Sequence, residues 1–167
     1  GLNNAPESRV KVIFVPCYLN GDDGIFNLPY YDLLPGDDLA VYPSYYEPWG
    51  YTPLESVAFH VPTITTDLAG FGLWANSLQK VESGKMKDES GTGDNSPLES
   101  GVKVIHRTDS NWDEAANEIK NSILAFTKMD VKMVTQLRRR AADISKKALW
   151  DKFVKYYLEA YEVALSK

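Results

Sequence analysis

Short apolar runs alternate along this chain with longer segments in which apolar residues recur every three or four positions. Runs of four to eight apolar or β-branched residues between turn-forming residues are typical of buried strands. Pro16 and Pro43 end two of these runs. The pattern therefore predicts four strands, at residues 10–15 (a buried strand), 39–42, 63–66 and 102–105.

Helical spacing and start signals account for most of the remaining chain. We expect Thr52 to cap a helix that ends near His60, because Pro53 suits the first helical position and Glu55 completes a T-x-x-E capping box. Other helices are predicted at 29–34, after a tight turn at 70–72, and from Asn111, which would form a capping box with Glu114, to about Lys128. Asp130 should begin the next helix, whose apolar face is Met133, Val134, Leu137, Ala141 and Ile144. A last helix should have a core face formed by Trp150, Phe153, Val154, Tyr157, Leu158 and Tyr161.

Alternating strands and helices predict an α/β fold, with a parallel sheet flanked by helices in a Rossmann-like arrangement. Residues 82–100 are polar and rich in Gly, Ser and Asp, which predicts a mobile surface loop. Ligands of such sheets bind beyond the carboxyl ends of the strands. Residues 43–52 lie there, between the second predicted strand and its helix.

Composition narrows the class of protein. A chain of 167 residues suits one domain or a large part of one, and its net charge of −5 argues against general nucleic-acid binding. No apolar run approaches the roughly 20 residues of a membrane span. The single Cys17 favours a reducing, cytoplasmic setting. The polar N-terminal segment has no signal-peptide core, and we expect the chain to be part of a longer one.

Residues 41–59 combine several tyrosines, a tryptophan and two carboxylates around a predicted helix start. Backbone amides of Gly50, Tyr51 and Thr52 would favour an anion such as a phosphate. Glu47 could accept hydrogen bonds from ligand hydroxyls, and Glu55 would lie near a ligand held at the helix start. This set fits a phosphate-bearing sugar better than a metal, for which the two histidines have no suitable spacing.

Each of these features also has a purely structural interpretation. Glu55 could serve only in the capping box, and Glu47 could be a solvated loop residue. The aromatic rings, including Trp49, could be packing residues. The arginine run 138–140 is typical of a solvated helix face. Composition and spacing by themselves therefore indicate an α/β domain that binds a phosphate-containing ligand.

Four segments carry a resemblance to a known family. They are YPSYYEPWGYTPLE at 42–55, VPTITTDLAGFG at 61–72, RVKVIFVP at 9–16 and the aromatic pattern at 150–164. Together they resemble glycogen synthase of the animal and fungal type, glycosyltransferase family 3. The contiguous SYYEPWGYTP string is highly specific, and the resemblance covers nearly the whole chain except 82–100.

This resemblance implies a retaining transferase that moves glucose from UDP-glucose to the non-reducing end of an α-1,4-glucan such as glycogen. Such enzymes have a GT-B architecture, with two Rossmann-like domains, an active site in the cleft between them and no metal or other cofactor. Residues 1–167 would be part of the C-terminal, nucleotide-sugar-binding domain, and the N-terminal acceptor domain would be absent. The chain alone is therefore expected to lack turnover. A homo-oligomer is compatible with the sequence.

The resemblance also implies roles for individual residues. Glu47, the catalytic candidate, would bind hydroxyls of the donor glucose. Gly50, Tyr51 and Thr52 would hold the distal phosphate, and Glu55 would contact the ribose. Tyr30, which precedes Glu47 by 17 positions, would stack on uracil. The substrate-binding string also contains Trp49.

The chain departs from the family pattern at two places. In family members that glucose 6-phosphate regulates, several spaced arginines lie on the helix before the conserved tryptophan. Here Arg138 matches one of these positions, whereas Val131, Val134 and Asp143 stand where other arginines would be expected. We therefore do not expect this regulation. His60 replaces a usual glycine, and histidine tolerates a left-handed backbone better than β-branched residues do. Two alternatives stay open: a related retaining transferase with a different donor or acceptor, and a non-catalytic nucleotide-sugar-binding module.

Overall fold

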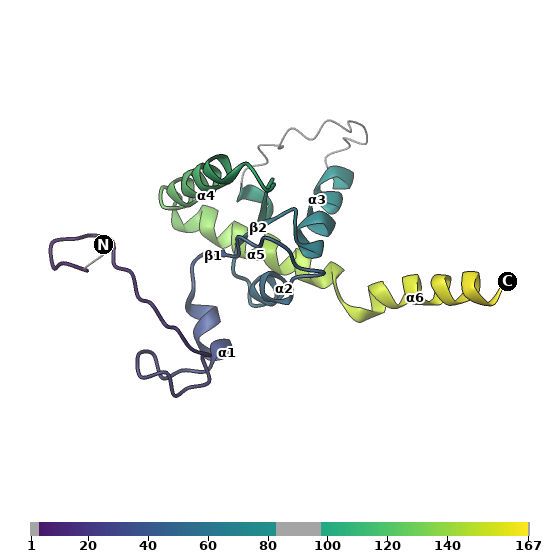
Figure 1. Cartoon of the computed structure of the whole chain (residues 1–167), viewed down its shortest axis with the longest axis horizontal. Coiled ribbons are helices and arrows are strands. Elements are labelled where there is room, and N and C mark those ends of the chain that lie inside the picture. The colour runs from purple at the N-terminus through teal and green to yellow at the C-terminus, as the bar shows by residue number, and fades with distance from the viewer. Residues whose placement is uncertain (1–3, 83–97, 167) are drawn as a thin grey trace. The chain divides into compact units, whose positions relative to one another are not determined.

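The computed structural model describes residues 4–82 and 98–166, and Figure 1 shows the course of the chain. It divides into two compact units, Gly1–Gly36 and Asp37–Lys167. The first unit contains the helix α1 (Tyr30–Leu33) and a 3₁₀ turn, η1 (Leu34–Gly36). The short helix predicted at 29–34 is thus confirmed.

The strand predicted at 10–15 is wrong. This segment has no strand partner among the described residues, and its side chains face solvent: Val10 is 68% and Phe14 78% exposed. Instead, the Val12 amide donates to the side-chain oxygen of Asn4 at 2.7 Å, and the Asn4 side-chain amide donates to the Val12 carbonyl at 2.6 Å. The apolar run indicates a surface to be buried, but a strand also needs a neighbour to complete its hydrogen bonds.

The second unit is built on a parallel sheet with the order β1-β2-β3. Its strands are β1 (Ala40–Val41), β2 (Thr63–Thr66) and β3 (Val102–Ile105). Ala40 pairs with Thr63, and Thr63 pairs in turn with Val102. Three of the four predicted strands are therefore confirmed, the first of them shortened to two residues. Every residue of β2 and β3 is buried, as expected for strands covered on both faces.

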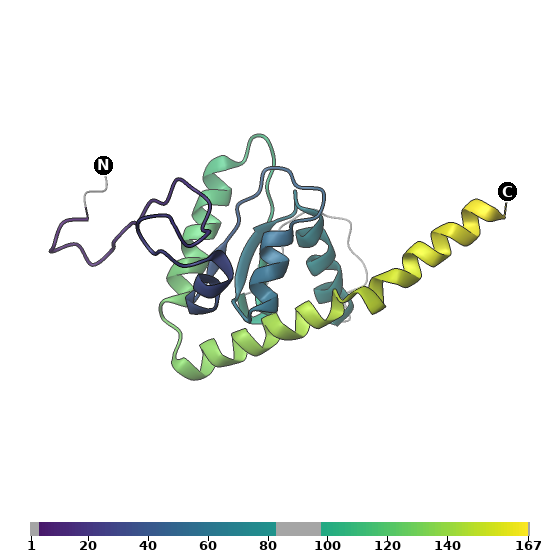
Figure 2. The same cartoon turned by 90° about the horizontal axis from the view of Figure 1, so that it is seen from below.

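Helices cover both faces of this sheet (Figures 1 and 2). The elements around the strands are α2 (Tyr51–Ala58), α3 (Gly70–Glu82), η2 (Leu98–Ser100), α4 (Trp112–Phe126), α5 (Val131–Lys147) and α6 (Trp150–Leu165). On one face Val102 and Val104 pack with Val57 of α2 and Phe71 of α3. On the other, Ile64 and Ile105 pack with Ala115 of α4 and Leu98 of η2. The parallel α/β arrangement is confirmed.

Helix α5 contributes to both clusters, through Leu137 on one side and Ala141 with Ile144 on the other. It passes the start of β3 so closely that a Cβ on Gly101 would lie 2.5 Å from the Ala141 nitrogen. Asp130 caps α5 as predicted, because its carboxylate accepts a hydrogen bond from the Met133 amide at 2.7 Å. Leu137, Ala141 and Ile144 are buried as expected, whereas Met133 is 43% exposed.

The core face predicted for the last helix is not buried. Within the described part of the chain no residue of α6 is buried, and Trp150 and Tyr161 are 64% and 60% exposed. Both views show α6 running outwards from the end of α5 (Figures 1 and 2). Helical spacing identifies an apolar face, but the surface that covers such a face is a property of the tertiary structure. None of the described helices is long and apolar enough to cross a membrane.

One predicted helix start and two predicted capping boxes need correction. Helix α2 begins at Tyr51, with Gly50 as its N-cap, so that Thr52 and Glu55 lie inside the helix and form no capping box. Asn111 does precede α4, but its side chain accepts from the Thr108 amide at 2.7 Å and is thereby used in the preceding loop. Side chains that can cap a helix also serve turns, and local spacing does not separate the two uses.

Two further predictions concern the flanks of β2. Residues 70–72 are the first turn of α3, and the turn itself lies at 67–68. His60 has a left-handed φ of +65°, the conformation that was expected at this position. The amides of His60 and Val61 bond the carbonyls of Val57 and Ser56, which closes α2 in a Schellman motif. Of the loop predicted at 82–100, residues 83–97 lie outside the described residues.

Candidate functional site

The segment between β1 and α2, residues 42–50, crosses the carboxyl end of the sheet. The Tyr42 amide donates to the Ile64 carbonyl at 2.8 Å and so continues the β1–β2 pairing. Farther on, the Glu47 amide donates to the Leu68 carbonyl at 3.2 Å, and the Glu47 carbonyl accepts from the Gly70 amide at 3.1 Å. The backbone of Glu47 is therefore fixed on both sides to the segment that follows β2.

Gly70 permits this close approach. A Cβ at this position would lie 2.3 Å from the carbonyl oxygen of Pro48 and 3.2 Å from the Cα of Trp49. Because both neighbours are backbone atoms, no side-chain movement could relieve the clash. The loop that carries Glu47 and the first turn of α3 thus pack backbone against backbone.

Gly50 turns the chain from this loop into α2. Its φ of +107° is a conformation that glycine adopts at little cost. The first four amides of a helix, from the N-cap onwards, have no partner within the helix. Here the fourth position is Pro53, so the amides at the start of α2 belong to Gly50, Tyr51 and Thr52. The N-cap residue Gly50 has no side chain that could cap them, and they form the anion-favouring end of the helix dipole.

The carboxylate of Glu47 lies beside this helix start. A Cβ on Gly50 would lie 3.6 Å from Glu47 Oε2, so the carboxylate stands against the turn. The Ser44 hydroxyl is 3.5 Å from the same oxygen. Glu47 is half-buried, and Glu55, in the second turn of α2, is half-buried as well. The Glu47 carboxylate therefore lies next to the turn that begins α2, and Glu55 lies one turn into the helix.

Trp49 packs in an aromatic cluster. Its ring contacts Phe71 and Trp74 of α3 and Phe153 of α6, with centroid separations of 6.1, 5.8 and 5.6 Å. This environment supports the packing interpretation of the Trp49 ring. In contrast, Tyr46 and Tyr51, on either side of it in the sequence, are 77% and 69% exposed.

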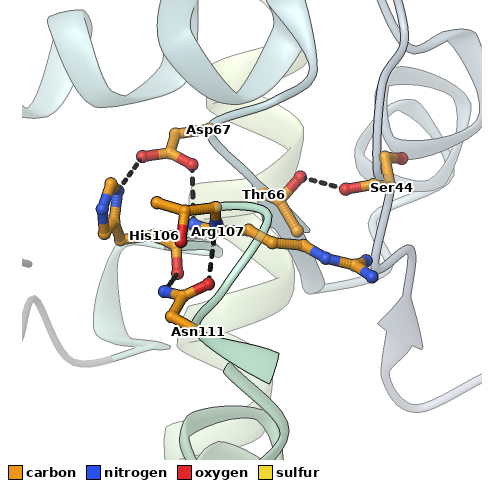
Figure 3. A network of polar contacts seen from close by, with 7 residues as sticks. Ser44, Thr66, Asp67, His106, Arg107 and Asn111 are labelled. Atoms are coloured by element: carbon orange, nitrogen blue, oxygen red, sulfur yellow. Dashed lines mark hydrogen bonds and ion pairs between the residues drawn. The ribbon is translucent and has the colours of Figure 1, made fainter. Parts of the chain in front are cut away.

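The carboxyl ends of β2 and β3 are joined by a polar network (Figure 3). Asp67 accepts from the Arg107 amide at 2.9 Å and lies 2.6 Å from Nδ1 of His106. The Asn111 side chain donates to the His106 carbonyl at 3.0 Å. On the other side of β2, the Thr66 hydroxyl donates to the Ser44 carbonyl at 2.6 Å. Thr66 thus connects the end of β2 to the loop after β1, and Asp67 connects it to the loop after β3.

The Arg107 side chain crosses from β3 to the loop after β1. Its guanidinium donates to the Pro43 carbonyl and lies over two rings, 5.2 Å from the centroid of Tyr45 and 5.0 Å from that of Trp112. The Tyr45 hydroxyl donates to Asp109. That hydrogen bond is the main reason why the pKa of Tyr45 is raised above its ordinary value.

Tyr30 belongs to the first unit. It begins α1, is partly buried and has its ring 5.3 Å from that of Tyr31, at an interplanar angle of 55°. Its amide donates to the Leu19 carbonyl at 2.8 Å. Among the described residues, no three His, Cys, Asp or Glu side chains gather as they would around a metal ion. Cys17 is an exposed free thiol.

Sequence reasoning did not identify Arg107, Asp67 or Asp109 as part of this region. A signal was present, because Asp67 and Arg107 follow the predicted strands at 63–66 and 102–105 closely. In a parallel sheet the residues after neighbouring strands meet at one edge. Applying that rule to every strand, and not only to the strand before Glu47, would have placed them together.

Comparison with known proteins gives a consistent result along the whole chain. A sequence model of the glycogen synthase family matches residues 1–167. The chain is 33% identical to glycogen (starch) synthase isoform 2 of Saccharomyces cerevisiae, over 99% of the chain and 22% of that protein. It is 30% identical to the liver glycogen (starch) synthase of Mus musculus, over 100% of the chain and 22% of that protein. The chain spans about a fifth of the length of these relatives.

Proposed function

The chain belongs to the glycogen synthase family, and we propose that it forms the donor-binding part of a retaining glycosyltransferase. In this proposal the full-length enzyme transfers glucose from UDP-glucose to the non-reducing end of an α-1,4-glucan. The 167 residues supply part of a Rossmann-like C-terminal domain of GT-B type. A second domain supplies the acceptor site, and the chain alone therefore carries out no transfer.

One observation supports the proposal most directly: the Glu47 carboxylate stands at the start of α2, next to the turn at Gly50. A nucleotide sugar presents hydroxyl groups beside a diphosphate. The Glu47 carboxylate can accept hydrogen bonds from the hydroxyl groups, and the amides at the start of α2 can donate to the diphosphate. The amides of Gly50, Tyr51 and Thr52 would hold the distal phosphate, and Glu55 would meet the ribose.

These groups would act as the bond between glucose and diphosphate breaks. Negative charge then increases on the leaving phosphate, and the amide donors and helix dipole of α2 favour that charge. Glu47 would orient the glucose through its hydroxyls. Its carboxylate would also favour the positive charge that develops on the sugar ring. Because the Glu47 backbone is bonded to Leu68 and Gly70, the carboxylate is held before substrate arrives.

Two residues have less direct roles in this proposal. The ring of Trp49, held by Phe71, Trp74 and Phe153, would anchor the loop from behind. Tyr30 would stack on the uracil base and thereby contribute to the choice of nucleotide. The second role rests on the resemblance to the family, in which the position of Tyr30, 17 residues before Glu47, matches a base-stacking tyrosine.

Substitution of Glu47 in the full-length enzyme tests the proposal. Glu47→Ala should lower kcat by about 100-fold or more, since preorganised polar groups of this kind supply a few kcal/mol to a transition state. Glu55→Gln should mainly raise the KM for the donor. Glu159→Ala, at an exposed position of α6, is the matched control and should leave both constants unchanged.

Wild-type turnover by a folded Glu47→Ala enzyme would contradict the catalytic role. Competition between UDP-glucose and ADP-glucose as donors would separate this proposal from a related transferase with another nucleotide. Transfer of glucose to glycogen by the purified 167-residue chain would show that the acceptor site does not require a further domain.

A further inference from the structure

Arg107 connects the end of β3 to the loop that leads to Glu47. The guanidinium donates to the carbonyl oxygen of Pro43, four residues before Glu47. A hydrogen bond from a charged donor is stronger than one between neutral groups. Figure 3 shows the side chain extending from the end of β3 towards the segment of Ser44. This contact spans 64 positions of the sequence and joins two strand ends that are not adjacent in the sheet.

Two aromatic rings hold the guanidinium in this place. Tyr45 and Trp112 stack on one another at 6.0 Å between centroids and 24° between planes, and Arg107 lies over both. The Trp112 indole donates to the Asp109 carbonyl at 2.9 Å, and Asp109 also accepts from Tyr45. Arginine suits such a position, because its planar group stacks on rings while its edges donate hydrogen bonds.

The backbone of Arg107 is itself fixed. Its amide donates to Asp67, whose other carboxylate oxygen meets His106. The side chain therefore starts from a defined turn at the end of β3. From the side of β2, the Thr66 hydroxyl bonds the Ser44 carbonyl. The loop between Pro43 and Glu47 is thus held at successive residues, with its only cationic contact in the described structure coming from Arg107.

We propose that Arg107 is a positioning residue for Glu47, which fixes the loop after β1 so that the Glu47 carboxylate stays at the start of α2. This inference rests on the proposed function, because Glu47 is the group that would touch the donor. Arg107 would not touch the donor, since its guanidinium is engaged by Pro43 and by two rings. Its loss should therefore affect turnover more than donor binding.

Kinetics and hydrogen exchange of the full-length enzyme together test this role. Arg107→Met removes the charge and the donor while keeping an apolar stem. It should lower kcat by about 10- to 100-fold, as a small displacement of a catalytic group does, with the donor KM nearly unchanged. Arg107→Lys keeps the cation and should recover part of the loss. Arg139→Met, at an exposed arginine of α5, is the control for the lost charge.

Amide exchange of residues 44–47, 49 and 50, which have an amide hydrogen, reports the position of the loop without any substrate. In Arg107→Met these amides should exchange about 10- to 100-fold faster, which corresponds to the loss of one charge-assisted hydrogen bond. Exchange in β2 and β3 should stay at the wild-type rate. Arg107→Lys should show an intermediate rate in the loop, in step with its recovery of kcat.

Several results would overturn the inference. In Arg107→Met these are unchanged exchange in the loop, or exchange that is equally faster throughout the sheet. Faster exchange in the loop with wild-type kcat would also overturn it, as would a raised donor KM with unchanged kcat. If the wild-type full-length protein shows no transfer at all, the proposed function fails. Loop exchange in Arg107→Met then still decides whether Arg107 holds this loop, and an unchanged rate would overturn that part too.

Discussion

Two threonines of β2 offer a matched test of the core. Thr63 and Thr65 are both fully buried and lie two positions apart, so they share one face of the strand. Thr63 donates its hydroxyl hydrogen to the Val61 carbonyl at 3.0 Å. Within the part of the chain that the structure describes, the Thr65 hydroxyl has no hydrogen-bond partner. Replacement by valine changes the hydroxyl to a methyl group and keeps the β-branched shape.

The expected effects differ in sign. A buried hydroxyl without a partner costs about 1–3 kcal/mol, and a buried methyl group contributes about 0.8 kcal/mol. Thr65→Val should therefore raise the free energy of unfolding by the sum of the two, about 2–4 kcal/mol. Thr63→Val loses a bond worth about 1 kcal/mol and gains the same methyl group, so its net effect should lie between zero and about 1 kcal/mol of destabilisation. The two variants should differ by about 2 kcal/mol or more.

Urea unfolding of the chain, followed by circular dichroism, measures this difference. The midpoint should rise for Thr65→Val with an unchanged slope, which would show that stability and not compactness has changed. In a thermal scan the two variants should differ by roughly 4–8 °C or more, at about 2–4 °C per kcal/mol for a chain of this size. Equal midpoints for the two variants, or a less stable Thr65→Val protein, would refute the reasoning from the unpaired hydroxyl.

Two other predictions concern the site. Calorimetric titration of UDP into the full-length enzyme should show that Tyr30→Ala loses about 1–3 kcal/mol of binding free energy, the usual contribution of one stacked base, and that Tyr30→Phe loses almost none. An equal loss in Tyr31→Ala would contradict the assignment. Gly70→Ala should lower stability by about 2 kcal/mol or more, because its methyl group would meet the Pro48 carbonyl. Gly36→Ala, where a methyl group meets nothing within 4 Å, is its control in the same thermal scan.

Elements with strong local signals could be predicted from the sequence. Strands β2 and β3 were found with the correct bounds because short runs rich in β-branched residues suit strands. The cap at Asp130 was correct, and its carboxylate accepts from the Met133 amide at the start of α5. The left-handed φ of His60 was expected from the family resemblance, in which a glycine usually stands at this position.

The failures have a common physical origin. Residues 10–15 and the apolar face of α6 have the composition of buried elements, yet their apolar side chains are largely exposed in the described structure. Local pattern reports what a segment needs, and burial depends on whether another part of the structure supplies it. The capping box at Thr52 failed for a related reason. Gly50 starts α2 two residues earlier through its positive φ, and a capping pattern contains no information on that angle.

The candidate site shows the same division between local and long-range information. Glu47, Gly50 and the amides of α2 lie within one short segment, so their spacing could be interpreted directly. Arg107 reaches this segment across 64 positions, and its place depends on Asp67 after β2. Such contacts become visible only when the order and direction of the strands are known. If Arg107 holds the loop as proposed, the placement of the catalytic carboxylate depends on the whole carboxyl edge of the sheet, and substitutions far from residue 47 in the sequence should lower turnover without weakening donor binding.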